Sequence, residues 1–74
     1  IDFIAYKDGK KYYIQVAYSV ADDKAYEREF GAFEKLDNSS KKILITNDDI
    51  DYSTSVVKHL KFKDFLLFDS LDDC

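Results

Sequence analysis

Residues 1–18 read IDFIAYKDGKKYYIQVAY, and this stretch decides the fold of the chain. Two runs rich in Ile, Val, Phe and Tyr flank the dipeptide Asp8-Gly9. Asp-Gly between such runs is a strong hairpin signal, because both central residues of a type I′ turn need a positive φ. A two-residue loop places Lys7 opposite Lys10, so the positions of every opposed pair sum to 17. We therefore expect an antiparallel hairpin in this register.

The register assigns each side chain of the hairpin to one of two faces. One face is apolar and pairs Phe3 with Ile14, Ala5 with Tyr12, and Ile1 with Val16. The other face is mixed and pairs Asp2 with Gln15, Ile4 with Tyr13, and Tyr6 with Lys11, with Ala17 one step beyond Gln15. Candidate polar chemistry on the hairpin therefore belongs to the second face.

A helix is expected after the hairpin, because Ser19-Val20-Ala21-Asp22 has the hydroxyl and carboxylate spacing of a capping box. The helix should extend to about Leu36, with apolar residues at helical spacing at Ala25, Tyr26, Phe30, Phe33 and Leu36. Gly31 lies inside this segment, where glycine costs about 1 kcal/mol relative to alanine. Its presence predicts a close approach of the helix to the sheet.

A second buried strand is expected at Lys41–Thr46, because Ile43-Leu44-Ile45 is uninterrupted and apolar. A strand, a helix and a second buried strand imply a right-handed crossover into a parallel pair. The polar residues 47–55 form the longest expected loop, followed by a short peripheral strand at residues 56–60. A short helix should then contain Phe62, Phe65, Leu66, Leu67 and Phe68, and residues 69–74 form a loose tail. The prediction is one α/β unit over residues 1–74, in the order strand-strand-helix-strand-strand-helix.

Composition excludes several classes of protein. Eleven basic and 15 acidic residues leave a net charge of −4, which disfavours a freestanding nucleic-acid binder with a basic face. A hydrophobic fraction of 46% excludes a disordered tail, and no apolar run approaches the roughly 20 residues that cross a bilayer. A single cysteine, Cys74, allows neither an internal disulfide nor a cysteine metal site. We expect a soluble cytoplasmic domain and, since the chain lacks methionine and starts at Ile1, a piece of a longer protein.

Outside the hairpin, candidate chemical groups have plain structural interpretations. His59 is the only histidine and is expected to be a half-buried strand residue. Residues 47–51 are acidic but lack the central glycine and terminal glutamate of a calcium loop, so they are read as a solvated loop. The lysines of the second half are read as a solvated sheet edge, with phosphate contact as the alternative: Lys41, Lys42, Lys58, Lys61 and Lys63. Gly9 and Gly31 stand alone, so the chain contains no glycine-rich phosphate loop.

The mixed face of the hairpin carries the most specific pattern. Nucleases that use two metal ions need carboxylates converging on Mg²⁺ and a nearby lysine, which an aspartate on one strand and Glu-x-Lys on the next supply. Ile1-Asp2-Phe3, the Asp-Gly hairpin and Tyr13-Ile14-Gln15-Val16-Ala17-Tyr18-Ser19 resemble the C-terminal domain, of uncharacterised function, of prokaryotic AAA-type P-loop ATPases. Its typical form is Glu-(Val/Ile)-Asp-Phe followed by Ile-Glu-Val-Lys-Ser. The resemblance extends to Val57-Lys58-His59-Leu60 and Asp64-Phe65-Leu66-Leu67.

The resemblance implies a partial restriction-endonuclease-like PD-(D/E)XK core, a mixed sheet flanked by helices. It also implies a parent ATPase domain that binds ATP and Mg²⁺, outside this chain. Asp2 matches the metal-binding aspartate and Ser19 the final serine, but Gln15 replaces the usual glutamate and Ala17 the usual lysine. Both replacements remove chemistry that hydrolysis needs, so nuclease activity is expected to be lost.

Two lysines, Lys11 and Lys24, are the candidates for restoring such a site from another position. Asp2 is the one clear carboxylate left on this face and its residual metal ligand. The favoured structural interpretation is a hydrogen-bonded cross-strand pair between Asp2 and Gln15.

Three functional hypotheses follow. The first is an inactive nuclease-fold accessory domain for packing or partner recognition, with Tyr6, Tyr13 and Tyr18 on its former active-site face. The second is a residual Mg²⁺-dependent nuclease or DNA-contacting domain, with nucleic-acid contacts at Lys58, Lys61 and Lys63. The third is a small dimerisation domain. Its interface is formed by apolar residues of the last helix, namely Phe62, Phe65, Leu66 and Phe68.

Overall fold

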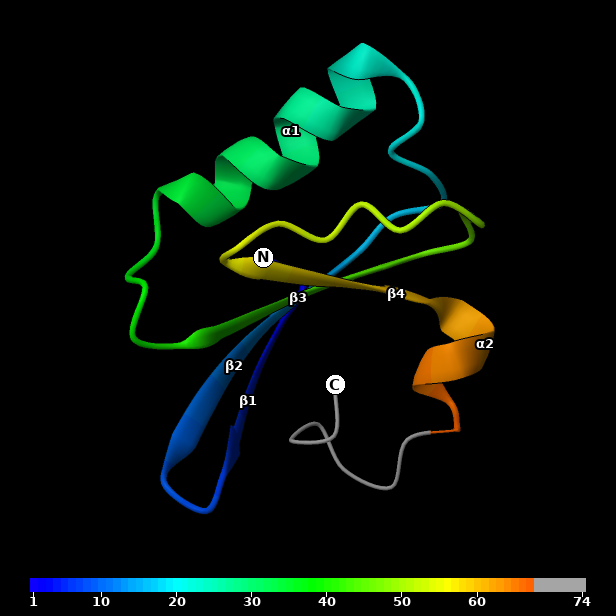
Figure 1. The fold of residues 1–74 in the computed structure, drawn as a ribbon. Coiled ribbons are helices and arrows are strands. Elements are labelled where there is room, and N and C mark those ends of the chain that lie inside the picture. The colour runs from blue at the N-terminus through cyan, green and yellow to red at the C-terminus, as the bar shows by residue number, and fades with distance from the viewer. Residues whose placement is uncertain (68–74) are drawn as a thin grey trace.

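The computed structural model describes residues 1–67, and it places four strands and two helices there (Figure 1). In chain order these are β1 (Phe3–Lys7), β2 (Lys10–Val16), α1 (Asp23–Glu34), β3 (Lys41–Thr46), β4 (Val57–Lys61) and α2 (Phe62–Phe65). The strands form one mixed sheet in the order β1-β2-β3-β4. β1 is antiparallel to β2, and β2, β3 and β4 run parallel. The predicted α/β order and the parallel pair are confirmed, whereas Phe68 and the tail with Cys74 lie outside the described residues.

The hairpin has the predicted register. Phe3 pairs with Ile14, Ala5 with Tyr12, and Lys7 with Lys10. Asp8 and Gly9 have φ values of 52° and 78°, as a type I′ turn requires. The local turn chemistry therefore sets the pairing of the whole hairpin.

The start of α1 differs from the prediction. The N-cap is Asp22, whose Oδ1 accepts a hydrogen bond of 2.9 Å from the Ala25 N–H. Ser19 is not part of a capping box, because its hydroxyl donates to Asp48 Oδ1 at 2.6 Å. Ser19, in the segment between β2 and α1, thus holds the loop that follows β3, and the helix begins one turn later than predicted.

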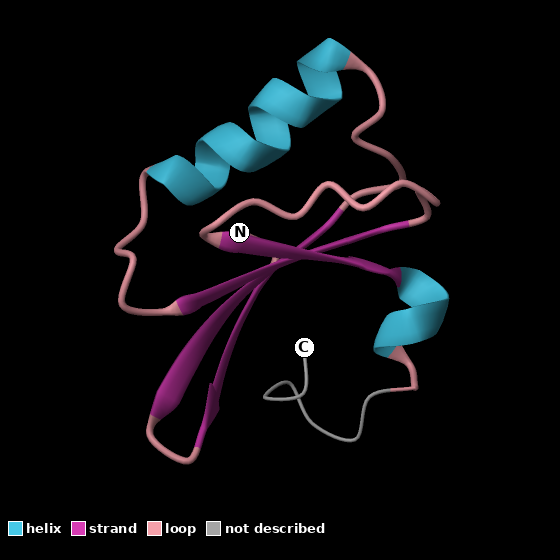
Figure 2. Ribbon diagram, viewed as in Figure 1, coloured by secondary structure: helices cyan, strands magenta, loops and turns pink. Residues whose placement is uncertain are grey.

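Two apolar clusters lie on opposite faces of the sheet. Figure 2 shows α1 lying across one of these faces. α1 covers the first face, where Phe30 and Phe33 pack with residues of β2, β3 and β4, namely Tyr13, Leu44 and Val57. On the second face Tyr12, Ile14, Ile43, Ile45 and Leu60 form the cluster, with Phe65 of α2 packed against it. The mixed face of the hairpin is therefore the face beneath α1.

Gly31 does not mark a close approach between α1 and the sheet, contrary to the prediction. A Cβ built at this position meets no atom within 4 Å. The phenylalanines on either side of it, Phe30 and Phe33, make the helix contacts with the core. Gly31 is therefore a weak point of the helix and not a packing requirement.

β4 is the peripheral strand that the sequence predicts, at one edge of the sheet. It begins at Val57 and ends at Lys61, where α2 follows directly. Neither helix within residues 1–67 has the length and apolar character needed to cross a membrane.

Candidate functional site

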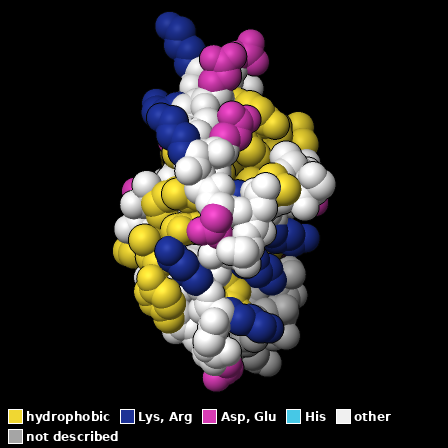
Figure 3. Space-filling model, turned by 90° about the vertical axis from the view of Figure 1, so that its left-hand side faces the viewer, with side chains coloured by type: hydrophobic (Ala, Val, Ile, Leu, Met, Phe, Trp, Pro, Cys, Tyr) yellow, Lys and Arg dark blue, Asp and Glu magenta, His cyan; other side chains and the backbone are white. Residues whose placement is uncertain are grey.

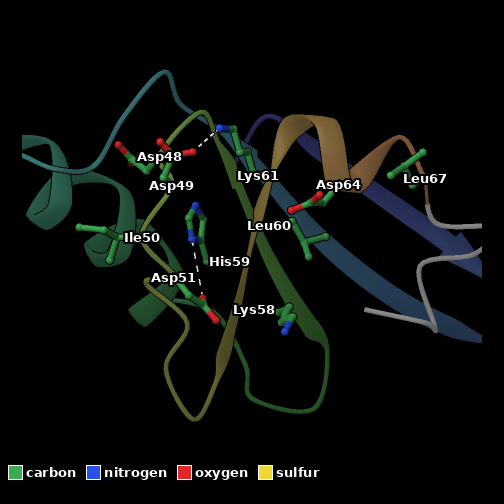
Figure 4. Close-up of a pocket in the computed structure, with 10 residues that line it drawn as sticks. All are labelled: Asp48, Asp49, Ile50, Asp51, Lys58, His59, Leu60, Lys61, Asp64 and Leu67. Carbon is green, nitrogen blue, oxygen red and sulfur yellow. Dashed lines mark hydrogen bonds and ion pairs between the residues drawn. The ribbon is translucent and has the colours of Figure 1, made fainter.

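A surface groove of about 460 Å³ lies where the loop after β3 meets β4 and α2 (Figure 4). The loop contributes three carboxylates, and β4 contributes Lys58, His59 and Lys61. Lys58 and Lys61 lie at opposite ends of the groove, and His59 lies between them. The remaining lining residues are Ile50, Leu60, Asp64 and Leu67.

His59 is the centre of a buried hydrogen-bond network. The Tyr52 N–H donates to His59 Nδ1 at 3.0 Å, and His59 Nε2 lies 2.6 Å from Thr46 Oγ1. Because a backbone N–H can only donate, Nδ1 carries no hydrogen, so Nε2–H donates to the Thr46 hydroxyl. The ring is therefore neutral, and it holds the loop to β3 and β4.

The electrostatic environment of His59 acts in the same direction. Burial lowers the pKa of His59, since desolvation penalises the imidazolium, and Lys58 adds to this effect. The carboxylates of Asp51 and Asp48 oppose the shift without reversing it. His59 is 5% exposed, so it is more buried than the half-buried strand residue that the sequence predicts.

Asp48 connects the loop to the start of α1. Its carboxylate accepts hydrogen bonds from the Ser19 hydroxyl at 2.6 Å and the Val20 N–H at 2.8 Å. Burial opposes ionisation of Asp48, but hydrogen bonds from Ser19, Val20 and Thr46 outweigh it and lower its pKa. Asp48 is therefore an anchor between two loops at the carboxyl ends of β2 and β3.

The other two loop carboxylates have partners of their own. Asp49 forms an ion pair with Lys61, and the hydrogen bond from Lys61 lowers the pKa of Asp49 and raises that of Lys61. Asp51 accepts from the Ser53 N–H at 2.9 Å, and hydrogen bonds from Ser53 lower its pKa. Across residues 1–67, no three His, Cys, Asp or Glu side chains are placed to share a metal ion. The acidic loop is held by separate local contacts, and its carboxylates do not converge.

The nuclease-like positions of the hairpin are occupied by structural contacts. Gln15 is buried beneath α1 at 6% exposure, and its Nε2 donates to the Glu29 main-chain oxygen at 3.2 Å. Asp2 Oδ2 accepts from the Val16 N–H at 2.8 Å. The predicted Asp2–Gln15 hydrogen-bonded pair is wrong, because each side chain has a different partner. Ala17 packs against the core cluster under α1.

The aromatic residues predicted for this face divide into two groups. Tyr13 is buried in the core under α1, and its hydroxyl lies 3.4 Å from Asp37 Oδ2. Tyr6 and Tyr18 are exposed and available for contact. Lys11 lies over the Tyr13 ring at 4.6 Å from its centroid, and the hydrogen bond with Tyr13 raises the pKa of Lys11. Lys24, the other candidate for a relocated lysine, is an exposed residue in the first turn of α1.

The lysines predicted as a basic patch are distributed among different contacts. Lys61 is paired with Asp49, Lys58 is half-buried, and Lys63 is exposed in α2. Lys42 is buried, and its Nζ donates to Asn38 Oδ1 at 2.7 Å and to the Leu36 carbonyl at 3.4 Å. The structure therefore does not bring these five lysines, Lys41 included, together on one face.

The apolar surface that the sequence predicts for the last helix, as a dimerisation interface, is partly exposed. Phe62 and Leu66 reach the surface, while Phe65 is half-buried against the second cluster. Phe68 lies outside the described residues. Figure 3 shows hydrophobic side chains at the surface in several patches, with Lys and Arg side chains between them.

No pattern in the sequence predicts the contacts that link His59, Thr46 and Tyr52. The available signal was weak: Thr46 ends the buried strand β3, and His59 is the only histidine of β4. Comparison of the chain with models of known protein families, with curated protein sequences and with solved structures finds no match.

Proposed function

We propose that the chain is an accessory domain with a degenerate restriction-endonuclease-like core, which recognises a protein partner and does not cleave nucleic acids. Under this proposal it belongs to the C-terminus of an AAA-type P-loop ATPase, and ATP and Mg²⁺ are bound by another domain. The strand-strand-helix-strand-strand-helix order and the Asp-Gly hairpin support the proposal.

The observation that carries the proposal is the position of Gln15. A nuclease of this kind needs a charged ligand here, open to Mg²⁺ and to substrate. Gln15 instead lies beneath α1 with its amide bonded to the Glu29 carbonyl. Moving it toward a metal ion would break this buried hydrogen bond, at a net cost of about 0.5–1.5 kcal/mol.

Recognition of a protein is supported by the exposed apolar side chains of the hairpin. Phe3, Ile4, Tyr6 and Tyr18 are all exposed on or next to β1 and β2. Aromatic residues are enriched in the centres of protein interfaces because they supply large contact areas. A nucleic-acid role is less well supported, since Lys61 of the predicted contact set is already paired with Asp49.

A cleavage assay tests the absence of nuclease activity. The chain is incubated with plasmid DNA and with single-stranded RNA in Mg²⁺ and in Mn²⁺, beside Asp2→Ala and the matched control Asp64→Ala. We expect no cleavage above that of Asp2→Ala. Cleavage that Asp2→Ala abolishes and Asp64→Ala retains would overturn the proposal.

A binding assay addresses the nucleic-acid alternative. Affinity for duplex DNA is measured as a function of salt, for the chain and for a variant in which Lys58, Lys61 and Lys63 are replaced by alanine. DNA binding that weakens with salt and with these substitutions would favour a DNA-contacting domain.

A further inference from the structure

The loop after β3 is attached to β4 through a ring that can change its charge. The Tyr52 N–H donates to His59 Nδ1 at 3.0 Å, and His59 Nε2–H donates to Thr46 Oγ1 at 2.6 Å. Nδ1 accepts this hydrogen bond only while the ring is neutral, because both nitrogens of an imidazolium are donors. Protonation of His59 therefore sets the new Nδ1–H against the Tyr52 N–H.

A different acceptor lies beside the same nitrogen. Asp51 Oδ1 is 3.8 Å from His59 Nδ1, and Figure 4 shows the two side chains facing each other. A carboxylate bonded to a charged N–H lies at about 2.7–2.9 Å, so Asp51 has to approach by about 1 Å to form this bond. The Tyr52 N–H then has to leave the nitrogen that Asp51 takes over. Protonation thus exchanges one partner of Nδ1 for the residue that precedes it in the chain.

The residues that follow Tyr52 hold the outer backbone edge of β4. The His59 N–H donates to Ser53 Oγ at 2.8 Å, and the Val57 N–H donates to Thr54 Oγ1 at 3.0 Å. The Val57 carbonyl accepts from the Thr54 N–H at 2.8 Å. All three bonds are made by the two residues next to Tyr52, so a displacement of Tyr52 acts on them directly.

We propose that protonation of His59 releases residues 52–54 from β4 and uncovers the outer backbone edge of this strand, while the rest of the sheet stays folded. The pairing of β4 with β3 does not involve the loop, and His59 belongs to neither apolar cluster. Tyr52 is only partly buried against the first cluster. Local openings of this kind need less free energy than global unfolding, because they expose few buried groups.

The surroundings of His59 set the direction of the change. Burial is the main reason why the pKa of the ring is lowered. Among the charged side chains around it, Asp51 and Asp48 of the loop raise the pKa, and Lys58 of β4 lowers it. β3 contributes the uncharged Thr46 hydroxyl. Release of the loop lessens the burial, so acid favours the released state.

α1 meets this region through aromatic rings. The centroid of the Tyr26 ring lies 6.2 Å from that of the Tyr52 ring, which lies 5.6 Å from that of the His59 ring. Release of Tyr52 therefore also separates the loop from α1.

The size of the effect follows from the titration of histidine. In the released state His59 should have a pKa near its usual value of 6.5, so about ten rings are protonated for each neutral one at about pH 5.5. In the closed state the pKa is lower, so the ring binds fewer protons at the same pH. The ratio of released to closed molecules should therefore rise, by up to about tenfold, as the pH falls from about 7.5 to about 5.5.

Native-state hydrogen exchange in low concentrations of urea measures this release. Protection is compared at about pH 7.5 and about pH 5.5, corrected for the intrinsic exchange rate, for the N–H groups of Tyr52, Thr54, Val57 and His59. We expect it to fall about two- to tenfold at the lower pH and to be insensitive to urea, because a local opening exposes little surface. The Leu44 N–H, in the interior of the sheet, should be better protected and should lose protection as urea is added.

Two carboxylates of the same loop give a matched pair of variants. Asp51→Asn removes the charge that faces Nδ1 but keeps the Oδ1 that accepts from the Ser53 N–H, whereas Asp49→Asn removes the charge paired with Lys61. We expect Asp51→Asn to reduce the pH effect at least twofold and Asp49→Asn to leave it unchanged. Equal effects of the two variants would overturn the exchange of partners at Nδ1.

His59→Asn removes the titrating ring and places an amide oxygen near the position of Nδ1. We expect the protection of the Tyr52 N–H in this variant to be the same at both pH values. In the wild-type chain, equal protection at both pH values, or a dependence on urea that matches that of Leu44, would overturn the proposal. Either result leaves the proposed accessory function untouched, because the release of the loop does not depend on it.

Discussion

Replacing His59 with phenylalanine tests the network that holds the long loop on the sheet. The His59 side chain is 2% exposed, and phenylalanine keeps an aromatic ring at that position. The substitution removes both ring nitrogens. It therefore removes the acceptor of the Tyr52 N–H and the donor to Thr46 Oγ1.

The cost can be worked out from these two contacts. An unpaired Tyr52 N–H costs about 1–3 kcal/mol, and the lost bond to Thr46 costs about 0.5–1.5 kcal/mol. The Thr46 hydroxyl still accepts from the Asp48 N–H at 3.0 Å, so it is not left without a partner. The sum is about 1.5–4.5 kcal/mol. That is a large part of the roughly 4–11 kcal/mol expected for a domain of 74 residues. At about 4–8 °C per kcal/mol for a domain of this size, we expect the thermal midpoint to fall by about 6–36 °C.

The same substitution should remove a pH dependence. The folded pKa of His59 lies below its usual value of 6.5, because the ring is buried. An unfolded chain therefore takes up a proton first, and the folded protein loses stability as the pH falls from above 6.5 through the folded pKa. The loop carboxylates of Asp48, Asp49 and Asp51 have lowered pKa values and stay ionised in this window.

Urea unfolding, followed by circular dichroism at about pH 7.5 and about pH 5, measures both effects. The wild-type chain should be less stable at the lower pH, and His59→Phe should lose less stability between the two. Ser53→Ala is the control for the pH dependence alone, because it removes the hydroxyl partner of the His59 N–H but keeps the titrating ring. Equal stability of wild type and His59→Phe at the higher pH would refute the network. An unchanged pH dependence in His59→Phe would refute the assignment to His59.

Three further substitutions test the fold and the former nuclease positions. Gly31→Ala should raise the free energy of unfolding by about 0.8–1 kcal/mol, because a Cβ there meets no atom; a loss of stability would show that α1 is packed at this point. Gln15→Glu should lower it by at least about 2 kcal/mol, because a buried carboxylate would face the Glu29 carbonyl. Calorimetry should detect no Mg²⁺ binding to that variant, and recovery of stability by Mg²⁺ would instead reveal a site open to metal. Asp22→Ala should cost about 1 kcal/mol in thermal unfolding, because it removes the hydrogen bond to the Ala25 N–H; no change would reject Asp22 as the N-cap.

Local chemistry explains which elements could be predicted. The Asp8-Gly9 turn depends on backbone conformations that only a few residues adopt readily, so two adjacent residues specify the register of all the pairs in the hairpin. The apolar run Ile43-Leu44-Ile45 needs cover on both faces, so its place in the interior of the sheet also follows from its composition.

Capping was harder to predict, because Ser19 and Asp22 are both good capping residues. Which of them caps α1 depends on Asp48, which is distant in the sequence and binds the Ser19 hydroxyl. The prediction that Gly31 marks a close approach of the helix to the sheet was wrong for a related reason. A glycine in a helix signals that something is unusual, but the sequence does not say whether the helix is tightly packed or simply weakened there.

The sequence by itself determined the order of the elements, the hairpin register and the face on which Gln15, Tyr13 and Ala17 lie. Those properties follow from backbone conformation and from the alternation of side chains along a strand, both of which are local. Only the tertiary structure decided what covers that face. α1 lies over it and supplies the Glu29 carbonyl to Gln15, and the loop after β3 folds back to bind His59. These contacts join residues far apart in the chain, so their partners are chosen by packing and by the need to pair buried polar groups.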